Sequence, residues 1–198
     1  VPHQRDPTYR TDIDGLRALA IIGVVAYHVR LPGISGGFVG VDVFFVISGY
    51  VITQLLARRL DATGRLSLAD FYARRIRRLF PALGLMLLVT VLLGYFLLSP
   101  TGPRQEFTKS SIASLLFVAN YYFLNTTGGY FNAPAELKPL LNLWSLSVEE
   151  QFYAVWPLTL ILISMFTAPA RRRVWILGAI ALITVISFVY GSLLVRSN

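Results

Sequence analysis

The sequence has no cysteine and only two histidines among its 198 residues. Without cysteine the chain cannot use a thiol nucleophile, a disulfide or a thiolate metal ligand, and two histidines are too few for a metal centre built on imidazole. We therefore expect no metal cofactor. Any catalysis would have to use histidine, carboxylates, hydroxyls or arginine.

Charged residues are also scarce. They make up 14% of the chain, whereas 55% of it is hydrophobic, and the mean hydropathy is +0.62. A soluble domain carries about a quarter charged residues. Several apolar stretches approach about 20 residues, the length of a helix that crosses a bilayer. The first begins too late, and such stretches recur too often, for a cleaved signal peptide, so we expect the chain to remain in the membrane.

The charge that is present is mostly arginine. Lys and Arg number 18 against 10 Asp and Glu, which gives a net charge of +8, and 16 of the 18 are arginine. They are concentrated in short segments between apolar runs. This pattern indicates membrane orientation, whereas a nucleic-acid-binding domain would spread such charge over a soluble face. We expect membrane lipid, and no nucleic acid, as a partner.

The predicted fold class is all-α: a polytopic helical bundle that forms a single membrane domain over residues 1–198. Residues 1–14 would be a polar cytoplasmic tail, and residues 67–80 an amphipathic interfacial helix whose arginines face lipid phosphates. About five to six membrane segments are expected. They lie at 15–31, 38–56, 81–98, 110–124, 144–166 and 174–195.

The arginine-rich segments predict the orientation. Segments 5–17, 58–78 and 171–173 should all lie in the cytoplasm, with the N-terminus, at the bacterial inner membrane. This requires an even number of crossings between residues 79 and 171. Segment 110–124 would extend only about 22 Å as a helix, against a hydrocarbon core of about 30 Å. We therefore expect this segment to be re-entrant, which leaves the loop at 125–143 outside.

The first apolar segment carries Arg17 near its start and His28 near its end. On a helix the two would lie within about 20° of one face and about 16 Å apart along the axis. An ionisable residue in a membrane helix costs roughly 2.5 to 3.5 kcal/mol at mid-bilayer, so it indicates function. His28 is the candidate general base, because imidazole titrates near neutral pH; the alternative is a histidine that only hydrogen-bonds a neighbouring helix.

Further polar residues fall in or beside the apolar segments. Asp42 should lie at the same depth as His28 and could orient its ring, or it could pair with an arginine. Ser48 could serve the site or bond its own backbone. Glu150 has capping-box spacing to Ser147 and reads as structural, which leaves Glu149 for acceptor binding or polar support.

Four stretches follow one another along the chain: GLRALAIIGVVAYH, GGFVGVDVFFVISGYVIT, FYARRIRRLFPAL and LNLWSLSVEEQFYAVWP. In this order and at similar spacing they resemble the N-terminal half of the bacterial acyltransferase-3 family, the membrane O-acyltransferases of surface glycans. Family members usually have more membrane segments, so the chain resembles the N-terminal portion of such a protein. The family's motif of Arg or Lys, ten residues and His falls on Arg17 and His28, its RxxR motif on Arg75 and Arg78, and its acidic position on Glu149.

The resemblance implies transfer of an acyl group, most simply acetyl, from cytosolic acetyl-CoA to a hydroxyl of an extracytoplasmic carbohydrate or lipid-linked sugar. His28, Asp42 and Glu149 would be catalytic. Arg17, Arg74, Arg75 and Arg78 would bind the donor phosphates, since arginine forms bidentate bonds to phosphate. Tyr130, Phe131 and Trp144 could stack on a sugar ring, although aromatic residues are common at membrane interfaces anyway.

Two other functions fit the same residues. In a proton-coupled transporter or flippase, Arg17, His28 and Asp42 would form the pathway, and transport would not need acyl-CoA. A non-catalytic regulator is the third possibility; it would consume no acetyl-CoA.

Overall fold

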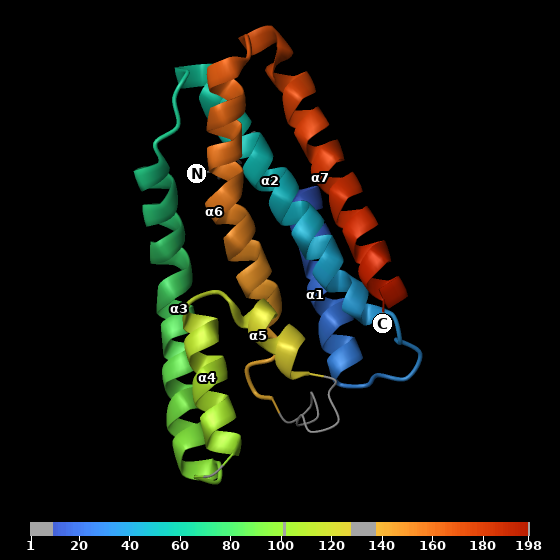
Figure 1. Ribbon diagram of the computed structural model, residues 1–198, viewed down its shortest axis with the longest axis vertical. Coiled ribbons are helices and arrows are strands. Elements are labelled where there is room, and N and C mark those ends of the chain that lie inside the picture. The colour runs from blue at the N-terminus through green and yellow to red at the C-terminus, as the bar shows by residue number, and fades with distance from the viewer. Residues whose placement is uncertain (1–9, 101, 128–137, 198) are drawn as a thin grey trace, which may run out of the picture. The chain divides into compact units, whose positions relative to one another are not determined.

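The computed structural model describes residues 10–100, 102–127 and 138–197. The regular structure in these ranges is helical, which confirms the all-α class (Figure 1). The short 3-10 helix η1 covers Gly37–Val39. The α-helices are α1 (Thr11–His28), α2 (Gly40–Thr63), α3 (Leu68–Leu97), α4 (Pro103–Leu115), α5 (Ala119–Thr126), α6 (Leu143–Phe166) and α7 (Pro169–Ser197).

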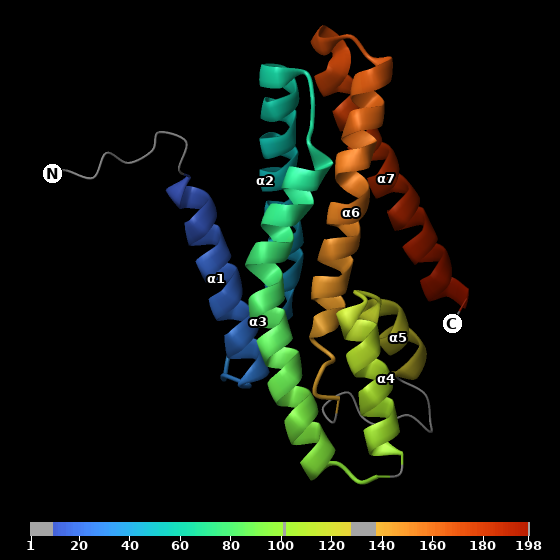
Figure 2. The same ribbon diagram turned by 90° about the vertical axis from the view of Figure 1, so that its left-hand side faces the viewer.

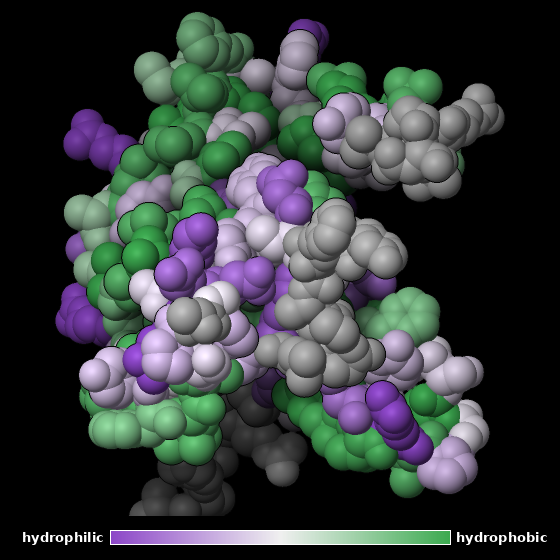
Figure 3. Space-filling view, turned by 60° about the horizontal axis from the view of Figure 1, so that its bottom comes forward, coloured by the Kyte–Doolittle hydropathy of each residue, from purple (hydrophilic) through white to green (hydrophobic). Residues whose placement is uncertain are grey.

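Within the described residues, three stretches are long and apolar enough to cross a membrane: Gly37–Thr63, Leu68–Leu97 and Pro169–Leu193. Only 6% of the most apolar window of the last one is buried in the protein, and Phe188 in it is 76% exposed. Hydrophobic side chains reach the surface in Figure 3 as well. Such surface suits hydrocarbon and not water, as expected of a polytopic membrane bundle.

The interfacial helix predicted for 67–80 is not a separate element. It forms the first half of α3, which continues to Leu97 with Pro81 inside it. Ser67 caps the start, since its hydroxyl accepts a hydrogen bond from the Asp70 amide at 3.2 Å. A proline inside a helix removes one backbone hydrogen bond. The helix nevertheless continues, because Phe71, Leu83 and Leu87 on either side of it are buried.

Segment 110–124 is not one helix either, because it is interrupted at Phe117. This residue has a φ of 55°, the Val118 amide donates to the Ala113 carbonyl at 2.8 Å, and the Phe117 amide donates to the Ser114 carbonyl at 3.2 Å. These two bonds form a Schellman motif, the usual end of a helix. The three stretches that are long and apolar enough to cross a membrane do not include α4 or α5, and they do not include α1 or α6 either. Of the predicted membrane segments, 15–31 and 144–166 thus lie outside these three stretches, as does 110–124.

α1 also ends in a Schellman motif, three residues before the end at Leu31 that the sequence predicted. Arg30 has a φ of 55°, and the Leu31 amide donates to the Ala26 carbonyl at 3.0 Å. His28 is therefore the last residue of α1. At the other end, Arg10 makes two hydrogen bonds with Asp12, at 2.8 and 2.6 Å. These bonds lower the pKa of Asp12 to about 2.

The chain divides into two compact units, residues 1–55 with 112–149, and residues 56–111 with 150–198. In the first unit, η1 packs directly against α1. A Cβ atom at Gly37 would lie 2.8 Å from the Tyr27 Cβ and closer still to the Gly23 carbonyl oxygen. Only glycine allows two backbones to approach this closely. The Tyr27 and Phe38 rings meet edge to face beside this contact, with centroids 5.6 Å apart.

In the second unit, α3 and α4 form a hairpin that is visible in both ribbon views (Figures 1 and 2). Phe107 of α4 fills the space left by the missing side chain of Gly94 on α3. The Arg104 guanidinium donates to the carbonyls of Tyr95 and Leu98, at 2.6 and 3.0 Å. Carbonyls in the last turn of a helix lack intrahelical partners, so Arg104 caps the end of α3.

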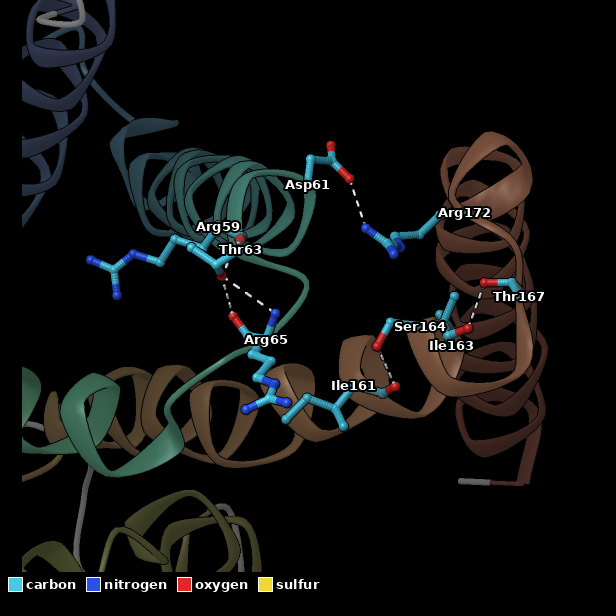
Figure 4. Close-up of polar contacts among 9 residues, drawn as sticks. All are labelled: Arg59, Asp61, Thr63, Arg65, Ile161, Ile163, Ser164, Thr167 and Arg172. Atoms are coloured by element: carbon cyan, nitrogen blue, oxygen red, sulfur yellow. Dashed lines mark hydrogen bonds and ion pairs between the residues drawn. The ribbon is translucent and has the colours of Figure 1, made fainter.

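An ion pair in the second unit joins the end of α2 to the start of α7. Arg172 lies 2.7 Å from Asp61 (Figure 4), and the Arg172 side chain is only 11% exposed. The arginine-rich segments around 58–65 and 171–173 therefore lie at the same end of the unit. This agrees with an even number of crossings between them.

We expect Gly37→Ala to destabilise the protein by about 1 to 3 kcal/mol, because the new methyl group would overpack a backbone contact. Thermal unfolding of the intact protein in detergent measures this. Gly84→Ala is the matched control, because a Cβ at Gly84 meets nothing within 4 Å. Equal unfolding midpoints for the two variants would contradict the close approach of η1 and α1.

Single cysteines introduced at Arg65 and Arg173 should react with a membrane-impermeant maleimide from the same side of the membrane, because the Asp61–Arg172 pair holds these segments together. A cysteine at Gly178, inside the apolar stretch of α7, is the unreactive control. Labelling of Arg65→Cys and Arg173→Cys from opposite sides would disprove the shared orientation.

Candidate functional site

His28, the candidate base, is exposed at the end of α1 and is oriented by its own helix. Its Nδ1 lies 2.8 Å from the Val24 carbonyl oxygen. A carbonyl can only accept a hydrogen bond, so Nδ1 carries the proton, and in the neutral ring the lone pair is on Nε2. The ring of Tyr27 contacts the imidazole edge to face, with centroids 5.6 Å apart. His28 thus presents the nitrogen that a general base requires.

Asp42 does not hold the imidazole as its predicted depth suggested. It lies in the first turn of α2 and is exposed. Among the hydrogen bonds of the described residues, His28 is joined to Val24 and not to Asp42. The tautomer of His28 is therefore set by the backbone one turn earlier.

Glu149 is bound to a serine from another helix. The Ser48 hydroxyl donates to Glu149 Oε1 at 2.6 Å, linking α2 to α6 within the first unit. Ser48 is only 8% exposed. Ser48 therefore uses its hydroxyl between helices, and not for its own backbone, which was one of the two alternatives. A short bond to a carboxylate is of the stronger, charge-assisted kind.

The capping box predicted for Ser147 and Glu150 is wrong, because α6 starts four residues earlier, at Leu143. Ser147 lies inside the helix and is buried. Its hydroxyl donates to the Leu143 carbonyl at 3.0 Å and accepts from the Ala119 amide at 3.2 Å. It thereby holds the start of α5 against α6. Glu150 is left for a different partner.

That partner is Arg75 of α3. The Arg75 guanidinium lies 2.8 Å from Glu150 Oε1, and its central carbon lies 3.2 Å from the centroid of the Tyr153 ring. The side chains of Arg75 and Glu150 are 24% and 16% exposed. Arg74 and Arg78 on the same helix are exposed, and Arg17 on α1 is half-buried.

The structure therefore joins two of the predicted site residues to partners that the sequence had not assigned to them. Ser48 and Glu149 are 101 positions apart, and Arg75 and Glu150 are 75 apart. No spacing rule predicts such contacts. Tyr153 and the Asp61–Arg172 pair were missed for the same reason. Trp144 packs its ring edge to face on Phe45, with centroids 6.2 Å apart, whereas Tyr130 and Phe131 lie outside the described residues.

Together these features define a class: a polytopic helical membrane protein in which several polar and charged side chains pair between helices, with an exposed histidine at a helix end. Residues 10–198 match the family described as "Acyltransferase domain". The chain therefore belongs to the acyltransferase-3 family, as its four motifs indicated.

Several curated proteins are similar to the chain. The peptidoglycan O-acetyltransferase OatA of Listeria monocytogenes is 44% identical over 153 residues, covering 75% of this chain and 24% of the relative. The O-acetyltransferase OatA of Staphylococcus aureus is 42% identical over 154 residues, covering 78% and 25%. YrhL of Bacillus subtilis is 39% identical over 186 residues, covering 94% and 28%. The chain thus spans about a quarter of the length of these relatives. No solved structure matches it.

Ser48→Ala should destabilise the protein by about 1 to 3 kcal/mol, since it removes a buried hydrogen-bond donor from a carboxylate. Glu149→Gln should cost less, because the amide oxygen can still accept from Ser48. Thermal unfolding in detergent is the measurement. Ser164→Ala serves as control, because that hydroxyl bonds a carbonyl of its own helix, Ile161. If Ser48→Ala unfolds like Ser164→Ala, the bond to Glu149 contributes nothing.

Proposed function

We propose that the chain is part of a membrane O-acetyltransferase that moves an acetyl group from cytosolic acetyl-CoA to a hydroxyl of a cell-wall glycan outside the membrane. Family membership and the relatives named as O-acetyltransferases support the reaction class. The observation that carries the chemistry is the hydrogen bond from His28 to Val24, because it leaves Nε2 as the basic nitrogen.

In this proposal His28 acts as general base. Nε2 takes the proton of the acceptor hydroxyl as the oxygen attacks the thioester carbonyl, forming the new C–O bond. The C–S bond then breaks, and the imidazolium returns the proton to the departing sulfur of CoA. The products are an acetyl ester and free CoA, and no further reactant is needed.

Glu149, which Ser48 holds in place, would support the acceptor. Asp42 would be an exposed carboxylate in the first turn of α2. Arginines at the inner side would bind the donor phosphates. Arg17 supplies one of these cations, and Arg74 and Arg78 of α3 supply the others. Arginine suits this role because its guanidinium forms two parallel bonds to phosphate oxygens.

We further propose that the N-terminus is cytoplasmic and that the protein lies in the bacterial inner membrane. Arginine-rich segments favour the cytoplasmic side. The Asp61–Arg172 pair joins the arginine-rich segments 58–65 and 171–173, which supports placing both on the same side of the membrane. The transporter alternative would use Arg17, His28 and Asp42 without acyl-CoA; family membership favours acyl transfer over it.

His28→Ala should lower acetyl transfer by about 100-fold or more, the usual contribution of a general base. Mass spectrometry of cell-wall glycans measures the product in cells that express the intact protein. His3→Ala, at the other histidine of the chain, is the matched control. Wild-type product from a normally inserted His28→Ala variant would exclude His28 as the base.

A further inference from the structure

We propose that the arginines of the RxxR motif have different tasks. Arg75 is a positioning residue that fixes α3 to α6, whereas Arg78, together with Arg74, meets the phosphates of the acyl donor. The second half of this inference rests on the function proposed above. The first half concerns the protein alone and does not depend on any ligand.

The guanidinium of Arg75 makes a hydrogen bond at its edge and a cation–π contact on its face. One terminal nitrogen donates to Glu150 at 2.8 Å. The guanidinium also lies over the ring of Tyr153, a residue that is only 5% exposed. One turn away on each helix, the Tyr72 hydroxyl donates to the Ala154 carbonyl at 2.9 Å. Tyr72 and Arg75 of α3 thus both bind the segment 150–154 of α6.

This arrangement is poorly suited to phosphate binding. A phosphate that approached Arg75 would also approach the Glu150 carboxylate, and like charges repel strongly where water is partly excluded. Moving Arg75 to reach a phosphate would leave Glu150, whose side chain is 16% exposed, without its cation. Separating one partner of a partly buried pair is the costly event, so Arg75 should stay where it is.

Arg74 and Arg78 are placed differently. Both are exposed, and among the described residues neither forms an ion pair. Four residues apart on α3, they lie within about 40° of the same face. Two adjacent guanidinium groups on one face match a pyrophosphate, whose charge is spread over several oxygens. The chemistry that would recognise them is thus that of a nucleotide-linked donor.

The decisive experiment compares Arg75→Gln, Glu150→Gln and the double variant in the purified intact protein. Arg75→Gln should lower the midpoint of thermal unfolding measured without ligand, and Glu150→Gln should restore part of it, because the double variant leaves no carboxylate unpaired. In acetyl-CoA turnover, Arg75→Gln should lower kcat while KM for acetyl-CoA stays within about twofold of wild type. The double variant should recover part of that kcat.

Arg78→Gln should behave in the opposite way. The unfolding midpoint should stay at the wild-type value while KM for acetyl-CoA rises by about tenfold, the effect of losing a charge-assisted bond to phosphate. Arg77→Gln is the matched control, an exposed arginine on the same helix whose Nε donates to the Ala73 carbonyl at 3.2 Å. It should leave both quantities unchanged.

The division of tasks is overturned if Arg75→Gln raises KM as much as Arg78→Gln does, or if Glu150→Gln restores nothing. It is also overturned if Arg78→Gln leaves KM unchanged. If the wild-type protein neither binds nor consumes acetyl-CoA, the proposed function fails. Unfolding without ligand then still decides whether Arg75 and Glu150 hold α3 to α6.

Discussion

Polar and charged groups that are withdrawn from water between helices need partners, and three such contacts join helices of this protein. An unpaired charge in hydrocarbon costs several kcal/mol, whereas a paired and hydrogen-bonded one is tolerated. Glu149 receives the Ser48 hydroxyl, Glu150 receives Arg75, and Asp61 receives Arg172. Each pair joins helices that are distant in the sequence. Three long apolar stretches, Gly37–Thr63, Leu68–Leu97 and Pro169–Leu193, suit lipid.

Glu149 and Glu150 are neighbours on α6, but their side chains have partners on different helices. Consecutive residues on a helix point about 100° apart, so Glu149 and Glu150 cannot share a partner easily. Glu149 belongs to the first compact unit and Glu150 to the second. Glu149 accepts a hydrogen bond from a hydroxyl, whereas Glu150 forms an ion pair with a guanidinium. The first suits a polar site, and the second suits a structural joint.

The candidate base is oriented by a contact within its own helix, whereas Arg75 is oriented by a contact with another helix. His28 is held by a carbonyl one turn back on its own helix, and α1 ends there because Arg30 adopts a left-handed conformation. This candidate base is therefore oriented by α1 itself, and the close contact of Gly37 with Gly23 and Tyr27 packs η1 against the same helix. Arg75 instead depends on the packing of α3 against α6. Changes in that packing would move the arginines without altering the tautomer of the histidine.

The amino-acid sequence alone determined the membrane class, the helical fold and the family, because these depend on composition, apolar length and local motifs. It also placed His28 and Arg17 on one helix. It did not determine the helix stops at Arg30 and Phe117, where non-glycine residues adopt positive φ, or the unbroken course of α3 through Pro81. Only the tertiary structure decided that Ser48 binds Glu149 and that Arg75 binds Glu150. Those contacts arise from helix packing across 101 and 75 positions, which no periodicity encodes.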